Sequence, residues 1–304
     1  MKIMVIGGTG FLGKAVVAKL KQNLENDVMA VGREYNSTMP YSWKPDAVIC
    51  MPGLVGGIMK NKTEPYTMLV KNLQMNTEVI DDCCRMKVPR LIYVMCGCSY
   101  PSKVQNPIRE ESLWQGTPDE NAKYYALGKA INALQVQAAR KQYMLDWSVV
   151  VPGNAYGPAD DFSMENGHVV AGMIRKFHDA KAANSDKVIL WGNGFPIRDF
   201  IFSEDVADGI IRALDRHHTS DLINIASGKG TSIKDLAEIV KEVVGFKGSI
   251  EWDVMKPGGP QVKVFDVERQ QEILGFSPKV GLKEGIKKTY DWYCSNLENG
   301  GVRL

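Results

Sequence analysis

A glycine-rich turn between a strand and a helix begins this chain. The apolar run Ile3–Ile6 leads into Gly7-Gly8-Thr9-Gly10-Phe11-Leu12-Gly13, and a segment with helical spacing follows. Gly7 and Gly10 permit a tight turn that approaches a pyrophosphate, and Gly13 permits close packing of the helix on the strand. Unpaired N–H groups at the helix start favour phosphate. The motif predicts a dinucleotide site made by Gly7, Thr9, Gly10, Phe11, Leu12 and Gly13.

The residue that selects the dinucleotide is expected about 20 residues beyond such a turn, where an acidic side chain binds the ribose of NAD. In this chain Arg33 stands there, followed by Glu34. A guanidinium suits the 2′-phosphate of NADP through charge-assisted hydrogen bonds. We therefore predict that Arg33 binds NADP and that NAD is the less favoured cofactor. The alternative for Arg33 is a solvated surface charge.

Strand-like and helical segments alternate through the first half of the chain. This alternation predicts a mainly parallel sheet with helices on both faces, a Rossmann-type doubly wound α/β fold. The predicted strands are Ile3–Ile6, Val28–Val31, Ala47–Cys50, Leu91–Met95 and Ser148–Val151, and the predicted helices are Gly13–Gln22, Tyr66–Arg85 and Lys123–Tyr143.

The pattern changes after Val151. Glycine and proline crowd residues 152–163, which predicts irregular backbone there. Helices are expected at Val169–Ala180, from Ser203, at Thr231–Val244 with Ser232 as its cap, and at Leu282–Ser295, with a strand at Val188–Trp191. We predict a dinucleotide-binding domain over residues 1–160 plus about 187–217, a smaller α/β substrate domain over 161–186 and 218–297, and a frayed tail over 298–304.

Charge and cysteine content exclude several classes of protein. Lys and Arg number 37 and Asp and Glu 35, so the net charge of +2 gives no general attraction to nucleic acid or membranes. No apolar stretch approaches the roughly 20 residues of a membrane helix. The 6 cysteines and 4 histidines form neither a dense disulfide framework nor a zinc-site spacing. We expect a cytoplasmic protein with reduced thiols and no metal.

Tyr125 and Lys129 form a Tyr-x-x-x-Lys motif inside a predicted helix. Residues four apart lie on the same helix face. A nearby ammonium stabilises phenolate and is expected to lower the pKa of Tyr125 from its ordinary value of about 10. Such a phenol can exchange a proton with a carbonyl oxygen during hydride transfer. We predict that this pair is catalytic and that Lys129 also contacts the cofactor.

Together these motifs resemble the extended short-chain dehydrogenase/reductases, the NAD-dependent epimerase/dehydratase family, which acts on nucleotide sugars. Within that family the closer resemblance is to the GDP-L-fucose synthases, the 3,5-epimerase/4-reductases of GDP-4-keto-6-deoxymannose, and it covers nearly the whole chain. Besides the two motifs above, it is carried by Leu54-Val-Gly-Gly-Ile58, Cys98-Ser-Tyr-Pro101, Pro152-Gly-Asn-Ala-Tyr-Gly-Pro158, Asn166-Gly-His168 and Trp191-Gly-Asn-Gly-Phe-Pro-Ile-Arg198.

The resemblance implies further site residues. Cys98 and His168 match the base and acid of epimerisation, which remove and return a proton beside a ketone. The loop that holds the nicotinamide matches Pro152, Asn154 and Ala155. The positions that bind the nucleotide diphosphate and its base match Lys176, Trp191, Arg198 and Lys263.

The chain departs from the family at several positions. Cys96 stands where relatives have a serine that helps the tyrosine hold the ketone oxygen, and a thiol is the weaker hydrogen-bond donor. Weaker support of the oxygen, compensation by Ser99 and a different substrate are three open explanations. Leu54 and Gly258 replace a lysine and an aspartate, and the segment after Arg33 is short.

The predicted function is NADPH-dependent epimerisation and reduction of a GDP-linked 4-keto-6-deoxy sugar. One alternative is another nucleotide-sugar 4-reductase, 4-epimerase or 4-dehydrogenase with bound NAD. An alternative outside enzymology is a binding module that senses NADP(H) without turnover. The resemblance also implies a homodimer joined through Tyr66–Arg85 and Lys123–Tyr143, against a monomer that buries those faces internally. No nucleic acid or membrane partner is expected.

Overall fold

A six-stranded parallel sheet forms the centre of the molecule. The structure is a computed structural model that describes residues 1–32, 43–164, 167–255 and 260–304. Within them the strand order is β2-β1-β3-β4-β5-β9, and every neighbouring pair is parallel. The strands are β1 (Lys2–Ile6), β2 (Asp27–Val31), β3 (Ala47–Cys50), β4 (Arg90–Val94), β5 (Asp146–Pro152) and β9 (Leu222–Ile225). The predicted Rossmann-type sheet is confirmed.

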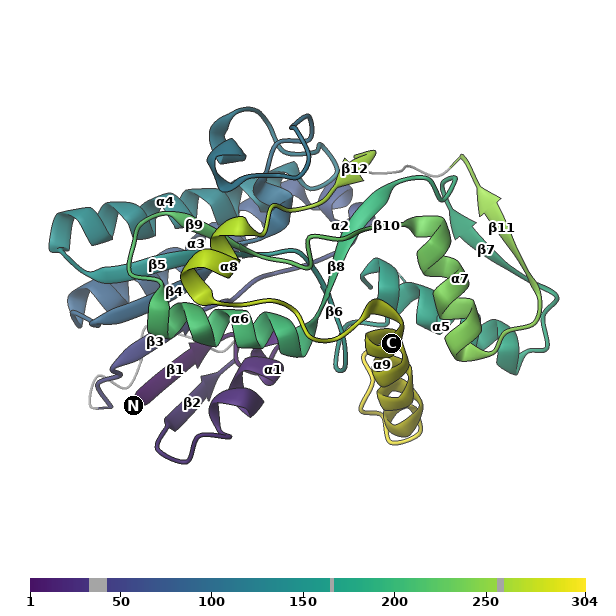
Figure 1. The fold of residues 1–304 in the computed structure, drawn as a ribbon, viewed down its shortest axis with the longest axis horizontal. Coiled ribbons are helices and arrows are strands. Elements are labelled where there is room, and N and C mark those ends of the chain that lie inside the picture. Colours follow the sequence, from purple (N-terminus) through teal and green to yellow (C-terminus); the bar gives the residue numbers. More distant parts are fainter. Residues whose placement is uncertain (33–42, 165–166, 256–259) are drawn as a thin grey trace.

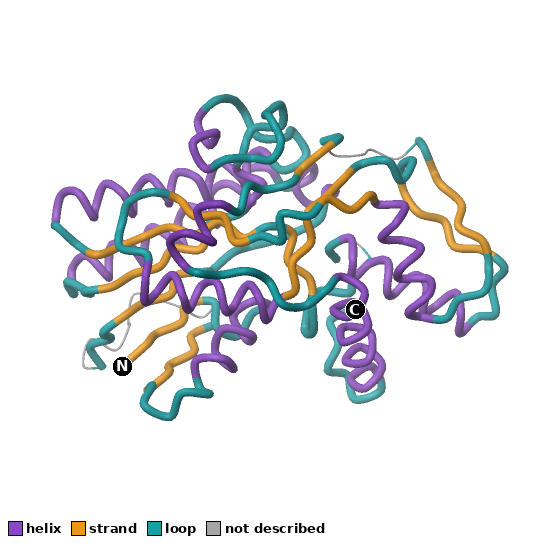
Figure 2. Tube along the Cα trace, in the orientation of Figure 1, coloured by secondary structure: helices purple, strands orange, loops and turns teal. Residues whose placement is uncertain are grey.

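Helices cover both faces of this sheet, as Figures 1 and 2 show. One face carries α1 (Phe11–Leu20) and α6 (Ser203–Arg216), and the other carries α3 (Pro65–Arg85) and α4 (Lys123–Tyr143). Alternate residues of β1 serve the two faces: Ile3 packs with Val16 of α1, whereas Met4 packs with Val136 of α4. Burial on both faces explains why the strands are almost continuously apolar.

A smaller lobe with its own core lies beyond the sheet. It contains α5 (Val169–Ala182), β7 (Lys187–Trp191), α7 (Ile233–Val244), β11 (Ser249–Asp253) and α9 (Leu282–Leu297). Phe177 of α5, Val240 of α7 and Ile286 of α9 are buried together in its core. Ser232 caps α7 by accepting a hydrogen bond from the Asp235 N–H at 3.0 Å, as predicted.

Short strands connect the two lobes. They are β6 (Asn154–Tyr156), β8 (Ile197–Phe202), β10 (Gly230–Ser232) and β12 (Val262–Lys263). The strand β6 corrects the expectation of irregular backbone over 152–163, because it pairs in parallel with Phe200–Phe202. That partner is distant in sequence, so the local glycine and proline content gave no sign of it. The remaining elements are α2 (Ile58–Thr63), α8 (Glu268–Leu274) and the 3-10 turns Gly97–Ser99 and Glu110–Trp114.

The lobe boundaries differ from the predicted domains in three places. The strand β7 was expected beside the sheet, but it pairs with β11 in the smaller lobe. The strand β9 was expected in the smaller lobe, but it extends the sheet by pairing with β5. The tail packs instead of fraying, because Val302 is buried and the Arg303 carbonyl accepts a hydrogen bond from the Phe162 N–H at 2.9 Å. Each difference is a long-range pairing that local sequence does not encode.

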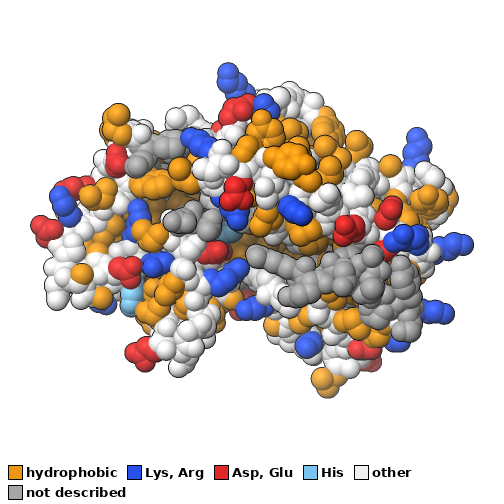
Figure 3. All heavy atoms as spheres, turned by 180° about the vertical axis from the view of Figure 1, so that it is seen from behind, with side chains coloured by type: hydrophobic (Ala, Val, Ile, Leu, Met, Phe, Trp, Pro, Cys, Tyr) orange, Lys and Arg blue, Asp and Glu red, His pale blue; other side chains and the backbone are white. Residues whose placement is uncertain are grey.

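The surface carries both signs of charge. Lys and Arg side chains intermingle with Asp and Glu across the face seen from behind in Figure 3. Among the helices in the described ranges, none has both the length and the apolar character that crossing a membrane requires.

Candidate active site

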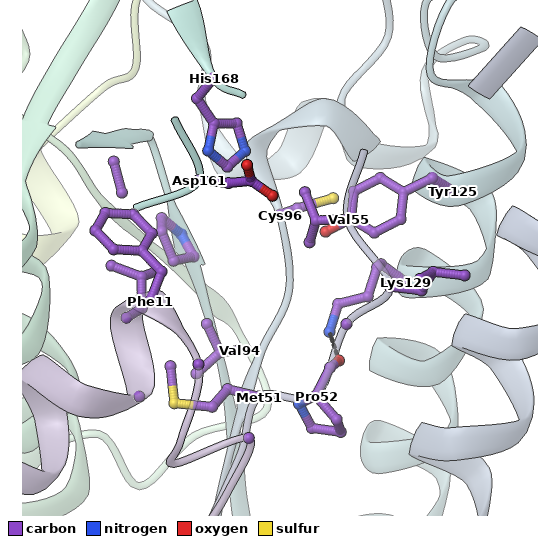
Figure 4. A pocket seen from close by; sticks show the side chains of 18 of the residues that line it. Phe11, Met51, Pro52, Val55, Val94, Cys96, Tyr125, Lys129, Asp161 and His168 are labelled. Atoms are coloured by element: carbon purple, nitrogen blue, oxygen red, sulfur yellow. Dashed lines mark hydrogen bonds between the residues drawn. The ribbon is translucent and has the colours of Figure 1, made fainter. Parts of the chain in front are cut away.

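A cavity of about 800 Å³ lies where the carboxyl ends of the sheet strands meet the smaller lobe. Such an edge is the usual ligand site of an open α/β sheet. One side, the sheet wall, is formed by Gly7, residues 9–13, Cys96, Cys98, Tyr125 and Lys129. The opposite side, the lobe wall, is formed by Asp160, Asp161, His168 and Arg303. Figure 4 shows side chains of both walls directed into one space.

The glycine-rich turn contributes its backbone to the sheet wall. Gly7 has φ +85°, a left-handed conformation that glycine adopts without strain. A Cβ on Gly13 would lie 2.0 Å from the Gly7 carbonyl oxygen, so only glycine fits there. Gly10 precedes α1 and has no side chain to cap it, which leaves the N–H groups of the first turn for an anion. This cradle fits a dinucleotide pyrophosphate.

The predicted cofactor residues gather at this cavity. All of those on the glycine-rich turn line it, and so do Pro152, Asn154 and Ala155 at the end of β5 and in β6. The Asn154 side chain donates a hydrogen bond to the Asp199 carbonyl at 2.8 Å, which fixes that loop on β8. The prediction for Arg33 lies outside the described residues.

Lys129 is buried behind Tyr125 on the same face of α4. Its Nζ donates to the Pro52 carbonyl at 3.2 Å and lies 4.5 Å from the centroid of the Tyr93 ring. The side chain is only 2% exposed, and this burial lowers the pKa of Lys129 to about 8. A cation this close to the cavity can hold a ribose or polarise the phenol beside it.

The expected direction of the Tyr125 shift is wrong. Burial raises the pKa of Tyr125 well above its ordinary value, and the Cys96 and Cys98 thiols add to the rise. Desolvation of the phenolate therefore exceeds any stabilisation by Lys129. Tyr125 stays protonated, which makes it a proton donor to an oxygen that gains negative charge.

Cys96 and Cys98 flank Gly97 directly after β4, and their thiols interact. The hydrogen bond from Cys96, with the positive charges of Lys263, His168 and Arg198, lowers the pKa of Cys98 despite burial. The same hydrogen bond and burial raise the pKa of Cys96 well above its ordinary value. Cys98 therefore has the character of a thiolate base, and Cys96 remains a thiol.

Ser99 does not replace the missing serine at the cavity. Its side chain is buried, and its hydroxyl donates to the Ala126 carbonyl of α4 at 2.8 Å. The Ser99 Oγ also lies 3.3 Å from the Cys96 Sγ. Ser99 thus fixes Cys96 against α4, and the Cys96 thiol hydrogen-bonds with Tyr125.

His168 faces the sheet wall from the start of α5. Its Nδ1 lies 3.0 Å from Oδ1 of Asp160, whose side chain is 1% exposed. The negative charge of Asp160 raises the pKa of His168, while the partial removal of the ring from water, its side chain being 45% exposed, acts in the opposite direction. Sequence reasoning missed Asp160, Asp161 and Arg303. The only local sign was the pair of aspartates in the loop before His168.

The predicted substrate residues form two pairs outside this cavity. Among the described residues that line it, Lys176, Trp191, Arg198 and Lys263 are absent. The Lys176 Nζ lies 5.6 Å from the Trp191 ring centroid. Arg198 and Lys263 are register partners on β8 and β12, and their charges act on Cys98. Lys176 lies on α5 and Trp191 ends β7, so this pair belongs to the smaller lobe, whereas Arg198 and Lys263 lie on the connecting strands β8 and β12.

Comparisons with known proteins agree with this geometry. The model of the NAD dependent epimerase/dehydratase family matches residues 3–226. GDP-L-fucose synthase 1 of Arabidopsis thaliana is 38% identical, over 98% of this chain and 94% of that protein. The structure of a GDP-L-fucose synthetase from Naegleria fowleri bound to NADP has a TM-score of 0.90 and 26% identity, covering 100% of this chain and 95% of that one. A GDP-mannoheptose C4 reductase from Campylobacter jejuni with NADP bound has a TM-score of 0.85 and 28% identity, covering 96% and 98%. By its sequence and its fold, this chain belongs to the NAD dependent epimerase/dehydratase family.

Proposed function

We propose that this chain inverts and reduces a GDP-linked 4-keto-6-deoxy sugar with NADPH, as a GDP-L-fucose synthase does. One observation carries the proposal: a single cavity holds the Tyr125–Lys129 pair together with Cys98 and His168. The first pair serves reduction of a ketone, and the second serves exchange of protons on the carbons beside it. The names of the relatives support the GDP-sugar class.

Inversion uses the two walls from opposite sides. Protons on carbons beside a ketone are acidic because the carbanion delocalises into an enolate. The Cys98 thiolate removes such a proton, and His168 returns one to the other face of the carbon from the lobe wall. The lowered pKa of Cys98 and the raised pKa of His168 suit these roles, because a base must begin deprotonated and an acid protonated.

Reduction uses the sheet wall. When bound, NADPH supplies a hydride to the ketone carbon. The residues of the glycine-rich turn hold its pyrophosphate, and Lys129 lies within the same cavity. Tyr125, whose raised pKa keeps it protonated, gives its proton to the oxygen that becomes an alcohol. Structures of relatives bound to NADP support this choice of dinucleotide over NAD.

The nucleotide half of the substrate is proposed to lie along the two outer pairs. Arg198 and Lys263 suit a diphosphate, and the Trp191 ring suits stacking on a base or a sugar. Lys176 lies against Trp191 and adds a positive charge. Part of the Arg198 guanidinium already donates to the Pro260 carbonyl at 2.6 Å, which orients it on β8.

The test is NADPH oxidation with GDP-4-keto-6-deoxymannose, run in D₂O. We expect turnover, and deuterium at the two carbons flanking the ketone in the product. Turnover without deuterium would contradict inversion and leave a plain 4-reductase, the candidate that similarity to the GDP-mannoheptose C4 reductase supports. No turnover with this compound, but turnover with another nucleotide sugar, would overturn the named substrate. Absence of all turnover, with tight NADP(H) binding, would favour the sensor module.

We also propose a homodimer through α3 and α4. The two helices pack on each other, and α4 leaves Ile131, Leu134 and Tyr143 at 39%, 51% and 55% exposure. Such side chains on one helix would be covered by a second copy. Sedimentation velocity of the chain and of Leu134→Glu tests this, because the charge should shift the protein towards monomer. The cytoplasmic location stays a prediction based on six free cysteines.

A further inference from the structure

One oxygen of Asp160 has no partner although it is buried. Among the described residues, few buried side-chain atoms lack a hydrogen bond, and Asp160 Oδ2 is one of two that belong to the cavity lining, with Asn61 Oδ1. The other oxygen of Asp160, Oδ1, contacts Nδ1 of His168 at 3.0 Å and accepts from the Asp161 N–H at 2.7 Å. Burying a carboxylate this deeply is costly, so its retention beside one histidine needs a reason.

The loop that carries Asp160 is fixed from the far end of the chain. The Phe162 N–H donates to the Arg303 carbonyl at 2.9 Å, and the Arg303 guanidinium donates to the Ala159 carbonyl at 2.9 Å. The backbone is therefore held by hydrogen bonds on both sides of Asp160. The carboxylate holds one ring nitrogen of His168, and it leaves the other nitrogen, Nε2, for the cavity.

We propose that Asp160 is the positioning residue of the proton donor: its carboxylate holds His168 Nδ1–H so that the charged ring presents Nε2–H to the substrate. This inference rests on the proposed function. A carboxylate only accepts hydrogen bonds, so Nδ1 is the donor. The Cys98 thiolate takes the proton of the substrate C–H bond, and that electron pair forms the enolate. The enolate then takes the Nε2 proton as a new C–H bond. Cys98 ends protonated and His168 neutral, and exchange with solvent restores both.

Three titratable groups act on His168, and they do not act alike. Asp160 makes the direct contact, whereas Asp161 and Cys98 contribute charge only. The Asp161 carboxylate instead accepts the Ser163 N–H at 2.9 Å. The Phe11 ring, with its centroid 6.5 Å from that of His168, adds an apolar neighbour. Asp161 therefore offers a matched control: it is adjacent, lines the same cavity and carries the same charge, but it does not touch Nδ1.

The experiment compares Asp160→Asn with Asp161→Asn in two assays. Deuterium uptake beside the ketone measures inversion, and oxidation of GDP-L-fucose by NADP⁺ measures hydride transfer that needs no inversion. For Asp160→Asn we expect deuterium uptake at neutral pH to fall by about tenfold or more. The rate of uptake should also begin to fall at a lower pH, because His168 loses its proton there; this decline is the alkaline limb of the pH profile. Oxidation of GDP-L-fucose should stay within about twofold, since Asp160 has no role in it. Asp161→Asn should keep the position of the limb within a few tenths of a pH unit.

An unchanged pH profile in Asp160→Asn would overturn the inference, and so would an equal loss in both assays. Absence of uptake in the unsubstituted protein would instead count against the proposed function. If Asp160→Asn fails to fold, ¹⁵N NMR of the four histidines in the native chain decides the matter. We expect one histidine to stay charged at Nδ1 and Nε2 to a higher pH than the others, and its signal to vanish in His168→Gln. A neutral His168 at neutral pH would refute the proposal.

Discussion

The two walls of the cavity are built in different ways. The sheet wall comes from short motifs that each follow one strand or occupy one helix, as in residues 7–13 and the Tyr125–Lys129 pair. The lobe wall comes from a loop, a helix start and the chain's last residues, brought together by Asp160, His168 and Arg303. Reduction therefore depends on local geometry, and proton delivery depends on tertiary packing. Substitutions in the two walls should accordingly separate the two chemistries.

The largest separation is expected between Tyr125→Phe and His168→Gln. Tyr125→Phe removes the hydroxyl that gives a proton to the sugar oxygen in reduction and takes it back in oxidation, so kcat for GDP-L-fucose oxidation by NADP⁺ should fall by roughly 10²- to 10⁴-fold. His168→Gln removes a lobe-wall residue and should leave that reaction within about threefold while abolishing deuterium uptake. Fluorescence titration with NADPH serves as the binding control. Comparable losses in both variants and both assays would mean that the walls do not work separately.

A second contrast concerns Gly13 in the glycine-rich turn of the sheet wall. Gly13→Ala places a Cβ 2.0 Å from the Gly7 oxygen, and relief of such a clash costs roughly 1–3 kcal/mol. We expect about 10- to 100-fold weaker NADPH binding and a lower midpoint of urea unfolding. Gly172→Ala in α5 is the matched control, because outside its chain neighbours and its own helix backbone no described atom lies within 4 Å of its Cβ position. That variant should bind NADPH normally and gain about 0.5–1 kcal/mol of stability. Normal binding by Gly13→Ala would contradict the assigned cradle.

A third contrast uses pH. Burial disfavours the ammonium, so Lys129 loses its proton near a pKa of about 8 instead of above 10. Raising the pH from 7 to 9 turns it neutral, and kcat/KM for reduction of the 4-keto sugar by NADPH, in which Tyr125 gives up its proton, should fall by about tenfold. Lys129→Arg keeps its positive charge throughout this pH range. Its kcat/KM should therefore not fall between pH 7 and 9, whatever its absolute rate. If kcat/KM of Lys129→Arg still falls over this range, the fall is due to the titration of another group.

The smallest expected effect is at Cys96. Cys96→Ser restores a hydroxyl, the better donor to the ketone oxygen, beside Tyr125. We expect kcat for reduction to rise by about two- to tenfold, with deuterium uptake also changed, because the thiol that hydrogen-bonds Cys98 is lost. A fall in reduction would indicate that the cavity is shaped for sulfur at this position.

The sequence was sufficient for features that are local. The strand and helix predicted at Ile3–Ile6 and Gly13–Gln22 occur at Lys2–Ile6 and Phe11–Leu20, because the glycine spacing between them leaves few other conformations. The predicted helix Lys123–Tyr143 is α4, and it carries Tyr125 and Lys129 towards the cavity. The predicted cavity residues of both walls also meet, including Cys98 and His168, which only the family resemblance indicated.

The sequence was insufficient where burial or distant pairing decides. The pKa of Tyr125 moves up, because desolvation depends on how the chain packs around the phenol and not on the nearby lysine alone. Asp160 could not be assigned, since its importance comes from a contact with His168 across an intervening loop. The predicted lobes of β7 and β9 were wrong for the same kind of reason. The partner of a strand depends on the whole fold and not on the strand's own composition.

The thiolate character of Cys98 also gives the protein a chemical label of its own. Alkylation by iodoacetamide proceeds through thiolate, so Cys98 should react faster at neutral pH than the more exposed Cys294. A nucleotide sugar in the cavity would shield Cys98 and leave Cys294 untouched, and peptide mapping by mass spectrometry distinguishes the two. The rate at which one cysteine is carboxamidomethylated would then report occupancy directly, which allows ligands to be screened without following turnover.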